Sequence, residues 1–218
     1  MKLLICTDSF QQLEIFSQKI QAQQPEPCLY QFSHAGHDIT WLICGHYFPE
    51  TLIRLQRVLS TTRFHLALKF SPGLSTDSTL SPETIVNIVN EVDTDRRLWT
   101  EEGWKDYYTC GWLNASETPH VRGGFINMHN AYIQVFMPYK KVVGHTPVKM
   151  NDPNASHEIV QQYKIAVETS NGLPFAYTCL WNKQPFYHLA IIKNNRSFME
   201  EKRQSDFSEL FRHLTDLL

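Results

Sequence analysis

Two pairs of closely spaced carboxylates are the first residues in the chain that could carry out acid and base chemistry. Asp93 and Asp95 are separated by one residue, and Glu101 and Glu102 are adjacent. Two neighbouring carboxyl groups can differ in pKa, so that one donates a proton while the other accepts one. A solvated acidic edge explains such pairs about five times as often. We therefore interpret both pairs as surface features.

Histidine and cysteine could supply metal ligands or a nucleophile. Of the ten histidines, His34 and His37 share a predicted turn and the others are scattered, so no metal site is expected. The five cysteines are widely spaced and form no CxxC motif, which argues against a zinc knuckle or a disulfide framework. Cys179 shares an apolar helix face with Phe175, as a packed core thiol does. We expect reduced thiols in a cytoplasmic protein.

Strong motifs for nucleotide binding, zinc binding or a nucleophilic serine are absent from the sequence. It contains no GxGxxG, no GxxxxGK, no HExxH and no GxSxG. The polar run Thr169–Gly172 and the pair Asn194 and Asn195 lie where strands meet loops or helices, and helix capping explains them on general grounds. We expect no cofactor and no metal.

Length and charge limit the class of protein. The chain has 218 residues with 20 Lys and Arg against 22 Asp and Glu, for a formal charge of -2. This length fits one domain spanning 1–218. The charge gives no basic field for a nucleic acid, and no apolar run approaches the roughly 20 residues of a bilayer span. Neither a nucleic-acid nor a membrane partner is expected.

The elements that position any site follow from hydrophobic periodicity. The pattern predicts a helix beginning near Phe10, a loop over Ser71–Pro82 and an irregular, aromatic-rich excursion at about 93–130. The other predicted helices are Pro49–Leu59, Ala155–Tyr163, Asn171–Asn182 and Asp206–Leu218. The predicted strands are Lys2–Thr7, Leu29–Phe32, Ile39–Cys44, Phe64–Phe70, Thr84–Val89, Tyr132–Met137, Val142–Val148, Ile165–Glu168 and Phe186–Ile192. Interleaved helices and strands predict a three-layer α/β/α sandwich around a central mixed sheet.

Ligands of such sheets collect in the crevice where strands end and loops begin. In this sequence, those places are the loops after Cys44, Phe70, Val148 and Ile192, together with the segment before Asn171. We therefore expect a site to be built from these five segments.

Several segments are similar to the nucleoside phosphorylase and nucleosidase superfamily. The best stretch runs from Lys141 to Asn194. It comprises Lys141–Thr146, Asn154–Ser156, Val167–Gly172, Tyr177–Leu180, Gln184–Phe186 and Ile191–Asn194 in the family order. The first half matches more loosely, at Met1–Ile5, Cys44–Gly45, Arg57–Leu59 and Leu66–Leu68. Within the superfamily the chain resembles a divergent member of the methylthioadenosine/adenosylhomocysteine nucleosidase and futalosine hydrolase branch, with a purine nucleoside phosphorylase-like fold.

The resemblance implies cleavage of the N-glycosidic bond of a purine nucleoside, assisted by acidic residues. Carried over residue by residue, the early glutamate of the family corresponds to Gln12, the ribose-binding glutamate to Asn171, and the aspartate after the last strand to Asn194. The futalosine branch can itself carry Asn at the last position. An amide cannot ionise, so it can neither take a proton from water nor place a negative charge beside an oxocarbenium ion.

Other positions also depart from the family pattern. Ser170 replaces the methionine before the second glutamate, Ala190 replaces an arginine of the last strand, and Pro72 interrupts the glycine-rich loop. The segment lining the site in the futalosine branch reads Pro147–Asp152 in this chain. The candidate pocket residues implied by the resemblance are Gly45, Ser71, Gly73, Met150, Asn151, Thr169 and Ser170.

These substitutions lead to two hypotheses. In the first, the chain has lost N-glycosidic hydrolysis and retains at most the binding of a purine nucleoside, a base or a partner. In the second, the alignment is displaced by a few residues, and the chain is an active N-ribosyl hydrolase of the futalosine hydrolase or methylthioadenosine nucleosidase type that uses Glu14, Glu168 or Asp152. The resemblance also implies a homodimer, for which Trp99–Trp112 is a candidate surface.

Overall fold

A computed structural model describes most of the chain. The described residues are 1–13, 23–94, 97–121, 124–129, 131–147, 157–193 and 207–218. Within this part, no helix combines the length and the apolar character that crossing a bilayer requires. All five cysteines are free thiols.

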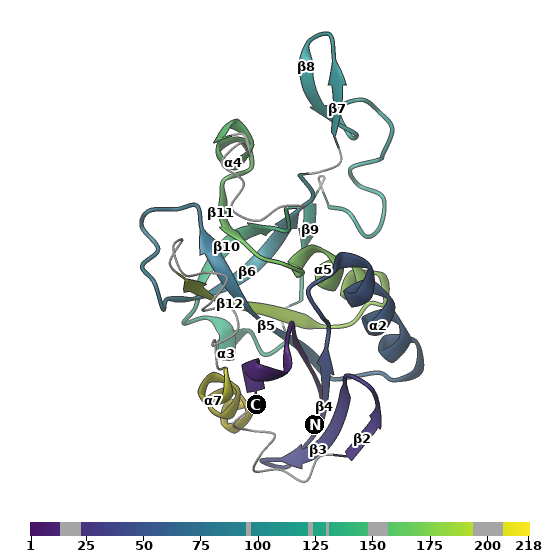
Figure 1. The fold of residues 1–218 in the computed structure, drawn as a ribbon, viewed down its shortest axis with the longest axis vertical. Helices are drawn as coiled ribbons and strands as arrows, with labels where there is room; N and C mark the ends of the chain where they lie inside the picture. The colour runs from purple at the N-terminus through teal and green to yellow at the C-terminus, as the bar shows by residue number, and fades with distance from the viewer. Residues whose placement is uncertain (14–22, 95–96, 122–123, 130, 148–156, 194–206) are drawn as a thin grey trace.

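Most strands belong to one mixed sheet, and the helices lie on its two faces (Figure 1). The strands are β1 (Lys2–Thr7), β2 (Gln23–Glu26), β3 (Leu29–His34), β4 (His37–Ile43), β5 (Leu66–Ser75), β6 (Ile85–Val92), β7 (Arg97–Thr100), β8 (Gly103–Asp106), β9 (Gly124–Ile126), β10 (Lys140–His145), β11 (Ile165–Glu168) and β12 (Phe186–Lys193). The helices are the 3-10 turn η1 (Phe10–Leu13), α2 (Phe48–Thr61), α3 (Ile133–Phe136), α4 (His157–Tyr163), α5 (Gly172–Trp181) and α7 (Ser208–Leu217).

The main sheet has ten strands in the order β11-β10-β6-β12-β5-β1-β4-β3-β2, with β9 paired to β6. The end of β5 also pairs with β11, which closes β5, β12, β6, β10 and β11 into a small barrel. β1 runs parallel to both β4 and β5. The carboxyl ends of β1 and β5 therefore lie at the same edge of the sheet.

Burial alternates along β1 and separates the two faces of the sheet. Leu3 and Ile5 pack in a cluster with side chains of α3 and α7, whereas Leu4 and Cys6 pack in a second cluster with side chains of α2 and α5. Successive residues of a strand point to opposite faces, so this strand is covered on both sides. The predicted α/β/α sandwich around a mixed sheet is confirmed.

Two predicted elements are wrong. The stretch Ser71–Pro82 is not a loop throughout, because β5 continues to Ser75 and pairs with β12, with Pro72 opposite Ile191. Pairing with neighbouring strands outweighs the local preference of proline for turns. The stretch Tyr132–Met137 is not a strand: it contains the short helix α3, which buries Phe136 against Tyr187 with ring centroids 3.7 Å apart.

The segment 93–130 contains regular pieces of its own. β7 and β8 form a separate two-stranded sheet that extends away from the main sheet in Figure 1. β9 returns to pair with β6. Between them, Tyr107 packs against Trp112 with ring centroids 5.5 Å apart. This segment thus brings aromatic side chains to the end of the barrel beside α5.

Candidate functional site

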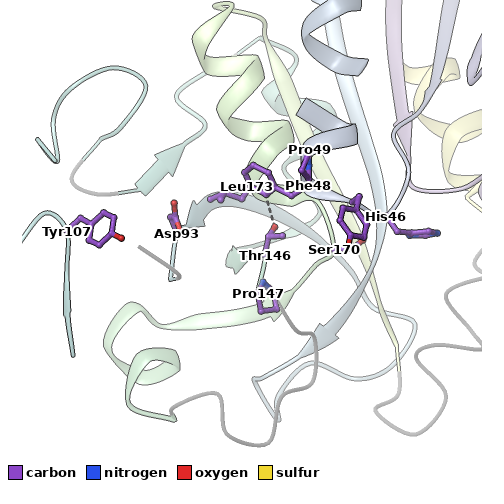
Figure 2. Close-up of a pocket in the computed structure, with 10 residues that line it drawn as sticks. His46, Phe48, Pro49, Asp93, Tyr107, Thr146, Pro147, Ser170 and Leu173 are labelled. Carbon is purple, nitrogen blue, oxygen red and sulfur yellow. Dashed lines mark hydrogen bonds between the residues drawn. The ribbon is translucent and has the colours of Figure 1, made fainter. Parts of the chain in front are cut away.

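A cavity of about 480 Å³ lies at the start of α5, beside the carboxyl ends of the strands. It is lined by His46, Tyr47, Phe48, Pro49, Asp93, Tyr107, Thr146, Pro147, Ser170 and Leu173. These residues come from the segment before α2, from the ends of β6 and β10, from the 93–130 segment and from the start of α5, and Figure 2 draws their side chains. Its volume and mixed apolar and polar lining suit a small organic ligand.

A buried ion pair lies behind the cavity wall. The Lys69 ammonium on β5 is 2.6 Å from Asp8 Oδ1, just after β1, and both side chains are fully buried. Burial disfavours the charged ammonium, but attraction and hydrogen bonding from Asp8 outweigh it, so the Lys69 pKa is raised. Each charge therefore stabilises the other in the buried state.

Two residues at the start of α5 also donate to the Asp8 carboxylate. Ser170 Oγ donates to Asp8 Oδ2 across 2.7 Å, and Asn171 Nδ2 donates to Asp8 Oδ1 across 3.3 Å. Asn171 Nδ2 also donates to the Gly45 carbonyl across 2.6 Å. Both acceptors require the NH₂ group of Asn171, which fixes the orientation of this amide.

Gln12 also contacts Asp8, through the backbone of that residue. Its Oε1 accepts the backbone N–H of Asp8 across 2.7 Å and that of Ser9 across 3.3 Å. Gln12 is fully buried, and its amide closes the turn that carries Asp8 out of β1. Two of the three family positions thus converge on one residue: Gln12 binds the Asp8 backbone and Asn171 binds the Asp8 carboxylate.

A second buried network crosses the barrel under α5. His188 Nδ1 on β12 lies 3.1 Å from Glu91 Oε1 on β6, and His188 Nε2 lies 2.7 Å from Ser71 Oγ on β5. Burial lowers the His188 pKa and so favours the neutral ring, and it outweighs the opposing effect of the hydrogen bond that the ring makes to Glu91. With Glu91 as the acceptor at Nδ1, the ring donates there and accepts the Ser71 proton at Nε2. A Cβ at Gly172 would overlap the Glu91 carboxylate, so the first residue of α5 has no room for a side chain.

A third group joins β10 to β11. His145 Nε2 lies 3.4 Å from Glu168 Oε1, and His145 Nδ1 lies 3.2 Å from Thr94 Oγ1. All three side chains are buried. The next residue, Thr146, lines the cavity and accepts the Leu173 N–H at the start of α5. Across the described ranges, no group of three His, Cys, Asp or Glu side chains could hold a metal ion.

The other residues implied by the resemblance take different positions. Ser170 lines the cavity, and Thr169 Oγ1 accepts the Gly172 N–H across 3.2 Å. Gly45 contributes the carbonyl bound by Asn171. Ser71 and Gly73 are buried within β5 and are not among the residues that line the cavity.

Several predicted residues lie outside the described part of the chain. These are Glu14, Met150, Asn151, Asp152 and Asn194. Ala190, at the position of the family arginine, pairs with Ser71 between β12 and β5. The described site therefore rests on two of the three amides.

Sequence reasoning did not find the buried charges. Asp8 directly follows the buried strand β1, and Lys69 interrupts the apolar run Phe64–Phe70 of a predicted central strand. A lysine buried inside a strand requires a partner. That rule identifies Lys69 as unusual but does not name Asp8, which lies 61 residues away in sequence. Glu91 was missed because the predicted strand ended at Val89, whereas β6 continues to Val92.

Comparison with known proteins gives a clear result at the level of structure. No family model matches the chain, and no curated protein matches it in sequence. The 5'-methylthioadenosine/S-adenosylhomocysteine nucleosidase from Neisseria meningitidis, in complex with methylthio-immucillin-A, superposes with a TM-score of 0.81 at 10% identity, covering 100% of this chain and 99% of that one. The corresponding enzyme from S. pneumoniae gives 0.79 at 11% identity, with both chains fully covered.

A futalosine hydrolase is equally similar. The structure of a futalosine hydrolase mutant of Helicobacter pylori gives a TM-score of 0.78 at 13% identity over the full length of both chains. At such low identity the agreement concerns the arrangement of the elements. The fold that the resemblance implies is thus confirmed: the chain has the same fold as these methylthioadenosine/adenosylhomocysteine nucleosidases and this futalosine hydrolase.

Proposed function

We propose that the chain binds a purine nucleoside or its base in the cavity beside Ser170 and does not cleave the glycosidic bond by the family route. The observation that carries this proposal is the convergence of Gln12 and Asn171 on Asp8, next to a cavity wall formed by Ser170. Structures of the same fold are described in complex with adenine or nucleoside analogues, among them one from Colwellia psychrerythraea with adenine.

The chemistry of these groups supports binding without hydrolysis. Gln12 and Asn171 cannot take a proton from water, and their hydrogen bonds hold Asp8 in place. Asp8 is the carboxylate that Asn171 contacts, but its side chain is fully buried and paired with Lys69. A carboxylate stabilised by three donors is a weak base. Water activation at this position is therefore unfavourable.

Incubation of the pure protein with methylthioadenosine, adenosylhomocysteine, inosine and futalosine tests the proposal. We expect at least one of them, or adenine or hypoxanthine, to raise the melting temperature at millimolar concentration, because a ligand of the native state stabilises it by mass action. No free base should accumulate. Turnover at rates typical of an enzyme would contradict the loss of hydrolysis, and a melting temperature that none of these compounds changes would contradict the binding site.

The second candidate function is hydrolysis by a carboxylate that lies a few residues away from the aligned family positions. It is favoured by the buried pair of His145 and Glu168, whose neighbour Thr146 lines the cavity. In this alternative, Glu168 takes the proton of the attacking water, and His145 orients the carboxylate. If the first assay detects free base, Glu168→Gln should abolish its release while ligand binding persists. Release that is unchanged in this variant would exclude the pair.

Self-association is also proposed, from the fold family and from one exposed aromatic side chain. Trp112 is 66% exposed and packs on Tyr107, which lines the cavity. Tryptophan is enriched at protein interfaces. Sedimentation at micromolar concentration should show a dimer, and Trp112→Ser should shift it towards monomer. A monomeric native protein would contradict this proposal.

A further inference from the structure

Ser170 connects the buried ion pair to the cavity. Its side chain lines the cavity wall, and its hydroxyl group donates to Asp8 Oδ2 across 2.7 Å. A serine hydroxyl has one proton and two lone pairs. Because the proton is used in the bond to Asp8, Ser170 Oγ can offer only lone pairs to any other group.

The direction of this hydrogen bond is set by Lys69. The ammonium lies 2.6 Å from Asp8 Oδ1, and the two side chains have no exposed surface. A cation at this distance favours the ionised carboxylate, which can accept hydrogen bonds but cannot donate them. Asn171 Nδ2 also donates to Asp8 Oδ1, and this hydrogen bond likewise favours the ionised carboxylate. The bond between Ser170 and Asp8 therefore runs in one direction only.

We propose that the pair of Lys69 and Asp8 fixes Ser170 as a hydrogen-bond acceptor in the cavity wall, so that the site selects a ligand that donates an O–H or N–H at this point. This inference rests on the proposed function, under which the donor is a hydroxyl group of the nucleoside sugar. Ser170 is then the residue that determines specificity, and Asp8 and Lys69 are positioning residues that act through it.

Adenosine and its three monodeoxy analogues, which lack the 2', 3' or 5' hydroxyl, provide the probes. Titration calorimetry measures their affinities for the native protein and for Ser170→Ala. In the native protein, one of the three analogues should bind about five- to tenfold more weakly than adenosine, as expected for the loss of one hydrogen bond. In Ser170→Ala that difference should disappear, while the other two analogues keep their original ratios to adenosine.

The direction of the bond is tested with the neutral double variant Asp8→Asn/Lys69→Met. The amide introduced at position 8 can donate to Ser170 Oγ, which releases the serine proton towards the cavity. A fluorine at the selected sugar position accepts weakly and cannot donate. The fluoro analogue should bind more weakly than adenosine to the native protein, and this difference should shrink or reverse in the double variant. The matched control is Asp77→Asn/Lys140→Met, which removes a partly exposed pair 3.6 Å apart and should leave the native ranking intact.

The outcomes separate the two proposals. If adenosine binds and the deoxy ratios are equal in the native protein and in folded Ser170→Ala, the role assigned to Ser170 is wrong and the proposed function stands. If neither a nucleoside nor a purine base binds to the native protein, the proposed function fails and the assignment fails with it. If only a base binds, the assignment of Ser170 to a sugar hydroxyl fails alone. A fluoro analogue that ranks identically in the native protein and in the folded double variant would also contradict the assignment. Circular dichroism and the melting temperature establish that each variant is folded.

Discussion

The side-chain amide of Asn171 donates to Asp8 across 3.3 Å and to the carbonyl of Gly45 across 2.6 Å. A carboxylate at position 171 would face two acceptors and could donate to neither. A carboxylate in the place of this amide would therefore be unfavourable while Asp8 is ionised beside it. The Asn171 amide donates and the Asp8 carboxylate accepts, so the negative charge lies at the end of β1 rather than at the start of α5.

Asn171→Asp tests this matching. We expect the variant to lose about 3 kcal/mol of unfolding free energy, because two hydrogen bonds are lost and a like charge is placed beside buried Asp8. It should not acquire nucleosidase activity. Urea unfolding measures the loss. The control is Asn114→Asp on an exposed loop, where the side-chain oxygen accepts the Ser116 N–H and aspartate can do the same. Equal stability of the two variants would contradict the account.

Lys69→Met should destabilise the fold by about 3–5 kcal/mol, because it leaves the Asp8 charge buried without its cation. Adding Asp8→Asn to this variant should recover part of the loss, since the unpaired charge is then gone. Thermal and urea unfolding of the two single variants and the double variant form the cycle. Additive losses would show that the two side chains do not interact energetically.

Gly172→Ala should cost about 1–3 kcal/mol, because the new methyl group would overlap the Glu91 carboxylate. Shortening the obstructing side chain in Glu91→Ala/Gly172→Ala should make the combined loss smaller than the sum of the two single losses. The unfolding free energies of the three variants test this. A double variant that loses the full sum would show that the two positions do not clash.

The buried ring of His188 predicts a loss of stability in acid. Burial lowers its pKa below the ordinary value of 6.5, so the unfolded chain binds a proton that the folded chain does not in the window just below that value. The unfolding free energy should therefore fall as the pH falls below about 6.5, and a group of this kind contributes at most about 1.4 kcal/mol per pH unit. His188→Gln should flatten the profile between pH 5 and 7. A slope that is the same in the native protein and in folded His188→Gln would contradict this prediction.

The predictability of the fold depended on how local each signal was. Ile165–Glu168 was predicted to the residue because its short apolar run is bounded by polar residues on each side. Pro72 misled the interpretation of β5, because pairing with β12 and β11 is a non-local effect that local turn preferences do not contain. Tyr132–Met137 was predicted as a strand from its apolar run, but it contains a single helical turn that is anchored by buried Phe136.

The sequence pointed to some of the residues around the buried ion pair and not to the pair itself. The resemblance pointed to Gln12 and Asn171, and the structure brings both to one place. The partner that explains their amides, Asp8, has a sequence signal only in combination with Lys69, and their pairing depends on β1 and β5 being neighbours in the sheet. Knowledge of strand order was therefore required before the charges could be assigned to each other.

Equilibrium dialysis of the protein against labelled methylthioadenosine, with chromatography of both compartments, tests the central claim most directly, because one measurement reports retention and cleavage together. The account predicts an excess of intact nucleoside on the protein side that disappears on competition with unlabelled adenosine, and no free adenine above the protein-free control. Adenine that accumulates with time and with protein concentration would contradict the loss of hydrolysis. Equal concentrations in the two compartments, for methylthioadenosine and for each of the other compounds of the melting assay, would contradict binding.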